Sequence, residues 1–319
     1  MQSQEQEVLA AARQTLRAGR QGWLATVIAV HGSSPRPPGS MALFAPPSQT
    51  GSLSGGCIEE ALLRQLVAGE LPATRPQRLR YGVSAEENAR LGLPCGGHLE
   101  VLLQRLEEQR DLPWIDAVLR ATGARECVLR RLDLDSGATQ IDAAPRHAAL
   151  ECDQYGLRQW FGPRQRMLLV GAGALAAQLA ELALALDYDV RVCDPRDEAR
   201  ADWSGPSLPL IGGMPDDAVR DFASDEHALV ITLTHDPRID DMALMEALES
   251  CAWYVGALGS RRTSAARRER LLALGIAPEA VERLHAPVGL DIGSKAPLEI
   301  AIAIMAEVTA LRRRPAGSP

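Results

Sequence analysis

The chain has 319 residues, 46% of them hydrophobic, and a net charge of −7. This length allows two domains of ordinary size, each with its own core, and the composition is that of a soluble globular protein. The acidic balance argues against a nucleic-acid partner, because phosphate binding needs a basic surface. Since no apolar run is long enough to span a membrane and the start is polar and acidic, we expect a cytoplasmic protein with free thiols and no membrane partner.

The first part of the chain alternates between helical and extended patterns. Apolar residues at helical spacing predict a helix over residues 5–18, and a β-branched run predicts a strand over 23–30. A loop rich in Gly, Pro and Ser, residues 31–40, leads to a second strand at 41–44. These patterns predict an α+β domain over residues 1–145. Its further expected elements are strands at 78–81, 101–103 and 127–132 and a helix at 112–119.

The most informative stretch of this domain is Gly-Ser-Leu-Ser-Gly-Gly-Cys-Ile-Glu-Glu at residues 51–60. It is predicted to be a loop that enters a helix ending at Gly69. Glycines such as Gly55 and Gly56 let the backbone approach a ligand closely, and the first N–H groups of the helix can bind an anion. Cys57 lies at this N-terminus, where the helix dipole stabilises a thiolate. The stretch predicts an anion site with a reactive sulfur, and a cysteine that only packs is the alternative.

A second segment, Pro-Cys-Gly-Gly-His-Leu-Glu at residues 94–100, has a similar composition. Both segments contain one cysteine, a glycine pair and a following glutamate. Two such segments in one domain favour a functional site over inert packing, provided that they meet in space. Neither shows the Cys or His spacing of a structural zinc site.

The pattern changes after a stretch without periodicity, which we interpret as a linker over residues 146–164. A short buried strand at 167–170 is followed by Gly-Ala-Gly-Ala-Leu-Ala (171–176), a helix to residue 186 and a strand at 189–193 that ends in Asp194. Strand, GxGxxA, helix, strand and acid in this order are the Rossmann fingerprint. We therefore predict a Rossmann-like, doubly wound parallel sheet over 165–319.

In this domain the N–H groups around Gly171 and Gly173 are candidates to bind a pyrophosphate, with Asp194 on a ribose hydroxyl. The alternative is a fold that has lost its ligand. His235 and Asp236 follow another strand, and a local turn is the simpler interpretation of that pair. The remaining expected elements are strands at 229–233 and 253–257 and helices at 240–248, 260–274 and 297–311.

Two further positions of the second domain are typical of anion binding. Ser260 and Arg261 open a helix directly after a strand, and a solvated basic face is the alternative for the arginines that follow. Lys295, the single lysine of the chain, precedes a helix that begins with proline. We include Ser260, Arg261 and Lys295 among the candidate ligand-binding residues.

Four motifs of this chain, in the order in which the family has them, resemble the XdhC/CoxI family. Its members are accessory proteins of xanthine dehydrogenase and related molybdenum hydroxylases. The four motifs are Ser-Gly-Gly-Cys-Ile-Glu (54–59), Pro-Cys-Gly-Gly (94–97) and residues 254–262 and 287–295. The resemblance implies binding of molybdenum cofactor, as molybdopterin or its nucleotide form, support of its sulfuration and its insertion into the apo-enzyme. It implies Cys57 as a molybdenum ligand. The other residues that it implies in the pocket are Gly55, Gly56, Glu59, Cys95, Gly96, Gly97, Ser33 and Ser34.

The implied partners are the molybdenum subunit of apo-xanthine dehydrogenase and a cysteine desulfurase, and we expect a homodimer. The resemblance to accessory proteins favours a chaperone over an enzyme. The rival interpretation is an NAD(P)-dependent oxidoreductase that uses the Rossmann domain, but it leaves the glycine–cysteine segments without a role. A third is a cysteine hydrolase or sulfur-transfer enzyme in which His31 or His98 acts as the base for Cys57.

Overall fold

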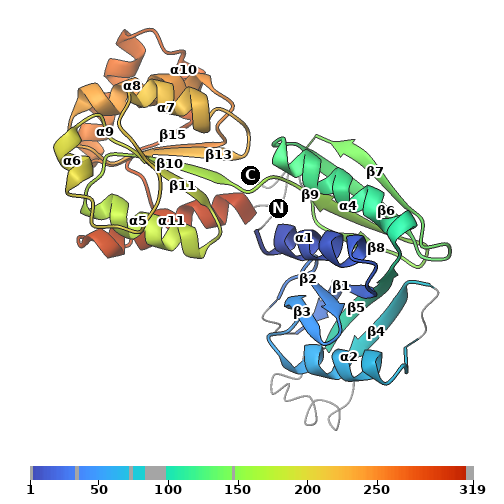
Figure 1. The fold of residues 1–319 in the computed structure, drawn as a ribbon. Helices are drawn as coiled ribbons and strands as arrows, with labels where there is room; N and C mark the ends of the chain where they lie inside the picture. The colour runs from blue at the N-terminus through green and yellow to red at the C-terminus, as the bar shows by residue number, and fades with distance from the viewer. Residues whose placement is uncertain (1–2, 33–35, 72–74, 83–97, 146–147, 314–319) are drawn as a thin grey trace. The chain divides into compact units, whose positions relative to one another are not determined.

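The chain divides into two compact units, Met1–Pro163 and Arg164–Pro319. The structure is a computed structural model and describes residues 3–32, 36–71, 75–82, 98–145 and 148–313 (Figure 1). Each unit has its own sheet and its own hydrophobic core, and each is described by itself below.

The first unit is built on an antiparallel sheet in the order β3-β2-β1-β5-β4. Its long central strands pair through residues 22–31 and 98–106, with a bulge between Val27 and Ala29. Trp23 pairs with Phe44 and Thr26 with Met41, so β1 and β2 form a hairpin-like pair around the loop that separates them. The strands are β1 (Gly22–His31), β2 (Met41–Ala45), β3 (Ser48–Gly51), β4 (Gln77–Tyr81) and β5 (His98–Leu106).

Helices cover both faces of this sheet, because successive strand residues point to opposite faces. Ala42 and Phe44 pack with the apolar side of α2 (Cys57–Val67), whereas Met41 and Leu43 pack against α1 (Ser3–Arg17) and α4 (Glu108–Gly123). The figure shows α2 against one side of the sheet and α1 against the other (Figure 1). The loop before α2 is thereby anchored on a rigid scaffold.

A second antiparallel sheet, in the order β7-β6-β9-β8, completes the first unit. It comprises β6 (Cys127–Asp133), β7 (Thr139–Ala144), β8 (Glu151–Cys152) and β9 (Gly156–Phe161). The stretch expected to be a linker, residues 146–164, therefore differs from the prediction, since β8 and β9 lie within it and β9 pairs with β6 from Gly156 to Phe161. Strands this short, exposed on one face, carry too little hydrophobic periodicity to be seen in the sequence.

The second unit contains a parallel sheet in the order β12-β11-β10-β13-β14-β15. This is the strand order of a doubly wound dinucleotide fold, with β10 and β13 on either side of the point where the strand order reverses. The strands are β10 (Arg166–Val170), β11 (Asp189–Cys193), β12 (Leu210–Ile211), β13 (Ala228–Thr232), β14 (Tyr254–Ala257) and β15 (Leu284–His285). The predicted Rossmann-like fold of this part of the chain is confirmed.

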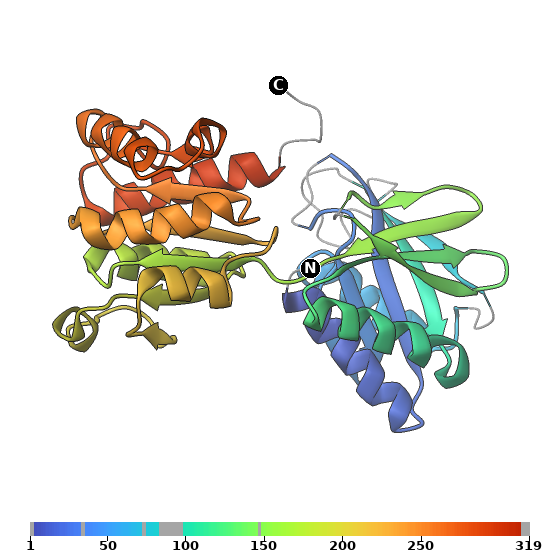
Figure 2. The ribbon, with the colours of Figure 1, turned by 90° about the horizontal axis from the view of Figure 1, so that it is seen from above.

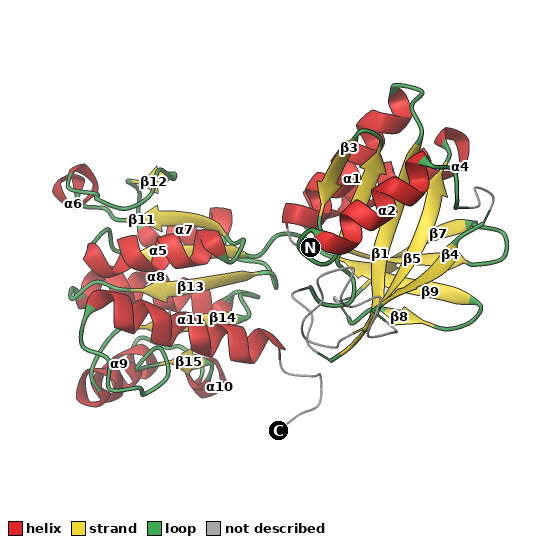
Figure 3. Cartoon of the chain, turned by 90° about the horizontal axis from the view of Figure 1, so that it is seen from below, coloured by secondary structure: helices red, strands yellow, loops and turns green. Residues whose placement is uncertain are grey.

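Helices lie on both sides of the parallel sheet (Figure 2). α5 (Ala174–Ala185) and α11 (Pro297–Arg313) pack on one face, and α7 (Pro215–Phe222) and α8 (Pro237–Glu249) pack on the other. The core strands are apolar on both faces, as expected for a buried parallel sheet. Figure 3 shows the strands of this sheet in yellow with helices in red on either side. Shorter or peripheral helices complete the unit: α6 (Asp197–Ala201), α9 (Arg261–Ala273) and α10 (Pro278–Glu282).

None of the helices described is both long enough and apolar enough to cross a membrane. Several short elements of the second unit, among them α6, α7 and β12, were not expected from the sequence, because each is too brief to stand out as a periodic segment.

Candidate functional site

A cavity of about 730 Å³ opens at the carboxyl edge of the parallel sheet. Its walls come from the segments that directly follow β10, β11, β13 and β14, with Pro297 and Ile300 of α11 closing one side. Ligands of doubly wound folds bind at this edge, next to the point where the strand order reverses. The cavity is therefore the candidate binding crevice of the second unit.

The glycine loop after β10 forms the floor of the crevice. Gly171 has a φ of +111°, and a Cβ placed there would lie 2.7 Å from Thr234 Cγ2, so this position requires glycine. Gly173, the N-cap of α5, is different: its φ is −97° and a Cβ would meet nothing within 4 Å. The fold does not require glycine at 173, and the space that its missing side chain leaves belongs to the crevice.

Asp194, expected on a ribose hydroxyl, has another role in this structure. Its side chain is fully buried, and one carboxylate oxygen accepts the backbone N–H of Ala172 at 2.9 Å. The Arg196 guanidinium donates to both oxygens, through Nε at 2.9 Å and Nη2 at 2.7 Å, and the Arg196 backbone N–H adds a third bond. Burial opposes ionisation of Asp194, but these hydrogen bonds outweigh it and lower its pKa. Asp194 thus braces the glycine loop and positions Arg196 in the crevice wall.

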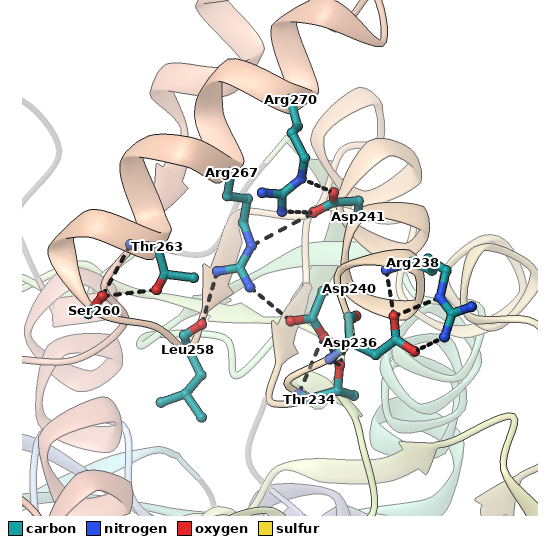
Figure 4. Close-up of polar contacts among 10 residues, drawn as sticks. All are labelled: Thr234, Asp236, Arg238, Asp240, Asp241, Leu258, Ser260, Thr263, Arg267 and Arg270. Atoms are coloured by element: carbon teal, nitrogen blue, oxygen red, sulfur yellow. Dashed lines mark hydrogen bonds and ion pairs between the residues drawn. The ribbon is translucent and has the colours of Figure 1, made fainter.

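The same arrangement recurs on the other side of the loop, after β13. Asp236 caps α8 by accepting the Arg238 backbone N–H at 2.9 Å. The Arg238 guanidinium donates to Asp236 through Nε at 3.0 Å and Nη2 at 2.7 Å (Figure 4). These hydrogen bonds from Arg238 lower the pKa of Asp236 to about 2. Asp236 therefore caps a helix, where the simpler interpretation of the His235–Asp236 pair was a local turn, and His235 lies beside it in the crevice wall.

A buried ion pair lies beneath the crevice and links two of its walls (Figure 4). Arg267 of α9 donates through Nη2 to Asp240 of α8 at 2.9 Å and through Nη1 to the carbonyl of Leu258 at 2.9 Å. Asp240 in turn accepts the Thr234 hydroxyl at 2.7 Å. Burial raises the pKa of Asp240 to about 6, although the bonds from Thr234 and the charge of Arg267 oppose the increase. Since Thr234 and Leu258 both line the cavity, this pair positions its rim.

Three residues predicted to contact a ligand do not line this cavity. Ser260 caps α9, its hydroxyl accepting the Thr263 backbone N–H at 3.1 Å. Arg261 forms an exposed ion pair with Asp291 at 3.1 Å. Lys295 is exposed, and its backbone N–H donates to Glu299 at 3.0 Å. Helix capping and surface pairing account for the polar contacts seen at these three positions.

In the first unit, Glu59 organises the glycine–cysteine loop. Its Oε1 accepts the backbone N–H groups of Leu53 at 2.7 Å and Ser54 at 2.8 Å, and its Oε2 accepts that of Gly56 at 3.0 Å. The Ser52 hydroxyl donates to Oε1 at 2.9 Å, and the Ser54 hydroxyl donates to Oε2. Backbone N–H groups of the loop are thus directed at a carboxylate of the chain itself, and the N–H of Ile58, in the first turn of the helix, donates to the Ser54 hydroxyl.

The ionised state of Glu59 is strongly favoured. Burial alone would raise its pKa, but the hydrogen bonds from the Ser54 hydroxyl and from the backbone N–H groups of Ser54 and Leu53 outweigh burial and lower the pKa to about 2. Gly55 and Gly56 have φ values of +100° and +143°, which only glycine adopts readily, and this allows the loop to fold around the carboxylate. Cys57 is left exposed at the start of α2.

Within the described residues, no histidine forms a hydrogen bond with Cys57. His31 and His98 instead stack on each other, with ring centroids 4.0 Å apart, where β1 and β5 pair. Leu99 packs with α2, so His98, its neighbour along the strand, faces away from that helix. Ser33, Ser34, Cys95, Gly96 and Gly97 lie outside the described residues. Within those residues, no group of three His, Cys, Asp or Glu side chains is placed to hold a metal ion.

Sequence reasoning missed Arg196 and Arg238 as crevice residues. A signal was present, because Asp-Pro-Arg occurs at 194–196 and again at 236–238, each time shortly after a buried strand. The proline restricts the backbone between the aspartate and the arginine, and the arginine side chain folds back onto the carboxylate.

The fold and the crevice define a two-unit protein whose second unit is a Rossmann-type, doubly wound domain. Residues 167–308 match the family described as XdhC Rossmann domain, and residues 15–82 match the XdhC and CoxI family. The chain belongs to the XdhC and CoxI family, as its motifs predicted.

Named relatives agree with this assignment over nearly the whole chain. The molybdenum cofactor insertion chaperone PaoD of Escherichia coli is 28% identical, over 96% of this chain and 88% of the relative. A protein of Bacillus subtilis named as a probable subunit of xanthine dehydrogenase is 27% identical, over 91% of this chain and 93% of the relative. The crystal structure of a xanthine dehydrogenase from Bacillus halodurans superposes with a TM-score of 0.73 at 27% identity, covering 98% of both chains.

Proposed function

We propose that this protein is a molybdenum cofactor insertion chaperone, which binds the cofactor and delivers it to xanthine dehydrogenase or a related molybdenum hydroxylase. The observation that carries the proposal is the crevice over the Gly171–Gly173 loop, in a chain that belongs to the XdhC and CoxI family. A relative named as a molybdenum cofactor insertion chaperone aligns with 96% of the chain. The family and the crevice together favour cofactor handling over a purely structural role.

The residues of the crevice fit the organic phosphate part of such a cargo. The space beside Gly173 admits a phosphate group at the N-terminus of α5, where free N–H groups and the helix dipole favour an anion. Arg196 and Arg238 add two guanidinium groups to the same walls. Phosphate recognition by arginine is a common use of this side chain.

The glycine–cysteine loop supplies the chemistry suited to the metal. Cys57 is exposed at the start of α2, directly after the loop whose N–H groups Glu59 accepts, and thiolates are soft ligands of the kind that heavier, softer metals accept. We propose that Cys57 contacts molybdenum during exchange of a terminal oxo for a sulfido group, with sulfur supplied by a cysteine desulfurase. The other finer parts of the proposal are a cytoplasmic location and a homodimer, the commonest oligomer.

The test is the molybdenum and pterin content of protein purified anaerobically from a cofactor-producing host. Cys57→Ala is compared with the wild type and with Cys251→Ala, which removes another exposed thiol. We expect bound pterin and molybdenum in the wild type and in Cys251→Ala, and loss of molybdenum from Cys57→Ala. An empty wild type would refute the chaperone function. A folded Cys57→Ala protein that keeps its molybdenum would refute the role of that thiol.

An NAD(P)-dependent oxidoreductase remains the second candidate function, because the crevice has the position of a dinucleotide site. Against it stands Asp194, which is buried and bonded to Ala172 and Arg196, and so does not present a free carboxylate to a ribose. The oxidoreductase predicts tight binding of a nicotinamide dinucleotide, measured by calorimetry, together with turnover of a carbonyl or hydroxyl substrate. A wild type that is empty of pterin but binds such a dinucleotide would favour this candidate.

A further inference from the structure

The same three-residue motif, Asp-Pro-Arg, occurs twice in the crevice. In Asp194-Pro195-Arg196 and in Asp236-Pro237-Arg238, the arginine donates its backbone N–H and its Nε to one carboxylate oxygen and its Nη2 to the other. The corresponding distances agree within 0.1 Å, at 3.0, 2.9 and 2.7 Å in the first case and 2.9, 3.0 and 2.7 Å in the second. Both guanidinium groups are therefore held in place before any ligand arrives.

The two Asp-Pro-Arg motifs lie on either side of the glycine loop. Arg196 follows β11 and Arg238 follows β13, and these strands are the two neighbours of β10, the strand that ends in the loop. Both arginines line the cavity over Gly171 and Gly173. They are also electrostatically close, since the charge of Asp236 acts on Arg196. A ligand phosphate on the loop thus has a guanidinium group on each side.

Each arginine keeps hydrogen-bonding capacity for a ligand. Nε and Nη2 are turned to the aspartate, while Nη1 of Arg196 and of Arg238 has no hydrogen-bond partner in the described part of the chain. The Arg238 side chain is 89% exposed and that of Arg196 52% exposed. Because each guanidinium is already paired with one carboxylate, a weakly charged ligand gains little from this arrangement. A ligand with several negative charges gains most, since it engages both sides at once.

We propose that Arg196 and Arg238 are the residues that determine ligand class in this crevice, and that together they select a diphosphate-bridged organic ligand over a phosphomonoester. One phosphate of the bridge sits on the Gly171–Gly173 loop and α5, and the two arginines hold the bridge from both sides. Taken with the proposed function, on which its biological meaning rests, this assigns the nucleotide form of the cofactor to the second unit.

The test is isothermal titration of the full-length protein with inorganic pyrophosphate and with inorganic phosphate at one fixed ionic strength. We expect pyrophosphate to bind at least tenfold more tightly than phosphate. Loss of one charge-assisted contact corresponds to a decrease in affinity of about 10- to 100-fold, so we expect that loss in Arg196→Ala and in Arg238→Ala. Arg220→Ala is the matched control, because Arg220 pairs with Asp216, Asp217 and Glu246 on the surface and does not line the cavity.

Arg238→Ala keeps the proposal falsifiable if Arg196→Ala does not fold. Removing Arg196 leaves the buried Asp194 unpaired, whereas Asp236 is one-quarter exposed and tolerates the loss of its arginine. Equal affinity for phosphate and pyrophosphate, or a folded Arg238→Ala protein with wild-type affinity for pyrophosphate, would overturn the proposal. The chaperone function and the role of the arginine pair can be refuted separately. A wild-type protein that contains no molybdenum or pterin but binds pyrophosphate through its arginines refutes only the chaperone function. A cofactor-loaded protein whose pyrophosphate binding does not depend on these arginines refutes only the role of the arginine pair.

Discussion

Arg267 of α9 and Asp240 of α8 form an ion pair inside the Rossmann unit, with Nη2 and Oδ2 2.9 Å apart and neither side chain more than 4% exposed. The pair holds the two segments that carry Thr234 and Leu258 at the rim of the crevice. Asp241, next to it, bonds to Arg270 at the protein surface. Because Arg267 also lies 3.8 Å from Asp241, the two ion pairs belong to one network, and they differ mainly in the burial of their arginines.

We expect Arg267→Ala to lower the free energy of unfolding of the second unit by about 3–5 kcal/mol, because it leaves Asp240 buried without its counter-charge. Arg270→Ala, at a pair that is 38% exposed on the arginine side, should cost about 1 kcal/mol or less. Urea denaturation of both variants measures the difference. Equal costs would show that burial does not set the strength of these pairs.

The destabilisation by Arg267→Ala should also grow with pH. The pKa of Asp240 is about 6 with Arg267 present, and removing the positive charge raises it further. Below pH 6 a protonated Asp240 needs no counter-charge, whereas above that pH the variant must either bury an unpaired charge or keep a proton. Melting temperatures of wild type and variant between pH 5 and pH 8 test this. A difference that shrinks as pH rises would contradict the prediction.

Glu59→Gln should loosen the glycine–cysteine loop. An amide nitrogen would replace one carboxylate oxygen among six backbone and hydroxyl donors, and we expect a cost of about 2–4 kcal/mol. Hydrogen–deuterium exchange measured by mass spectrometry should report faster exchange at Leu53, Ser54 and Gly56. The control is Glu60→Gln at the exposed neighbouring position, and identical exchange in both variants would argue against Glu59 as the organiser of the loop.

The same carboxylate predicts an acid-dependent loss of stability. The folded-state pKa of Glu59 is about 2 and its ordinary value is 4.5, so its contribution is complete above pH 4.5 and is lost as the pH falls towards 2. The shift corresponds to roughly 3 kcal/mol. Wild type and Glu59→Gln should therefore converge in melting temperature between pH 4.5 and pH 2. A constant difference over that range would speak against an ionised Glu59 in the folded loop.

Two glycines of the loop after β10 should differ in how much stability is lost on substitution by alanine. Gly171→Ala places a Cβ 2.7 Å from Thr234 Cγ2 at a φ of +111°, and we expect a cost of about 2–4 kcal/mol. Gly173→Ala meets no atom and should cost about 1 kcal/mol at most. Its methyl group, however, fills space that a ligand phosphate needs. We expect the Gly173→Ala variant to fold and to lose bound cofactor, measured as molybdenum and pterin content. A folded variant with the full content of both would refute the placement of a ligand phosphate beside Gly173.

Much of the architecture could be predicted from local pattern. The strand, glycine loop, helix and strand around Gly171 have a period and an order that few other folds share, and the observed sheet follows them. The helix after Cys57 was predicted for the same reason. The strands in the segment that was expected to be a linker could not be predicted. β8 has only two residues and pairs with its neighbour β9, and β9 is stabilised by pairing with β6 rather than by its own pattern.

The site was predicted less completely, because the role of a polar residue depends on its neighbours in space. Asp194 has the position and type of a ribose-binding acid, yet its own loop and Arg196 occupy its oxygens. Glu59 fits a ligand-binding loop equally well, yet it accepts the N–H groups that a ligand would use. Local sequence cannot distinguish a carboxylate that binds a ligand from one that binds the chain itself.

By itself the sequence determined the family, the Rossmann character of the second half and the place of both glycine-rich loops, because these depend on residue order and periodicity. Only the tertiary structure decided which groups are left over for a ligand. Hydrogen-bond donors and acceptors are used by whichever partners folding brings near. Here this leaves Cys57 exposed at the start of α2, and Arg196 and Arg238 on the two sides of Gly171.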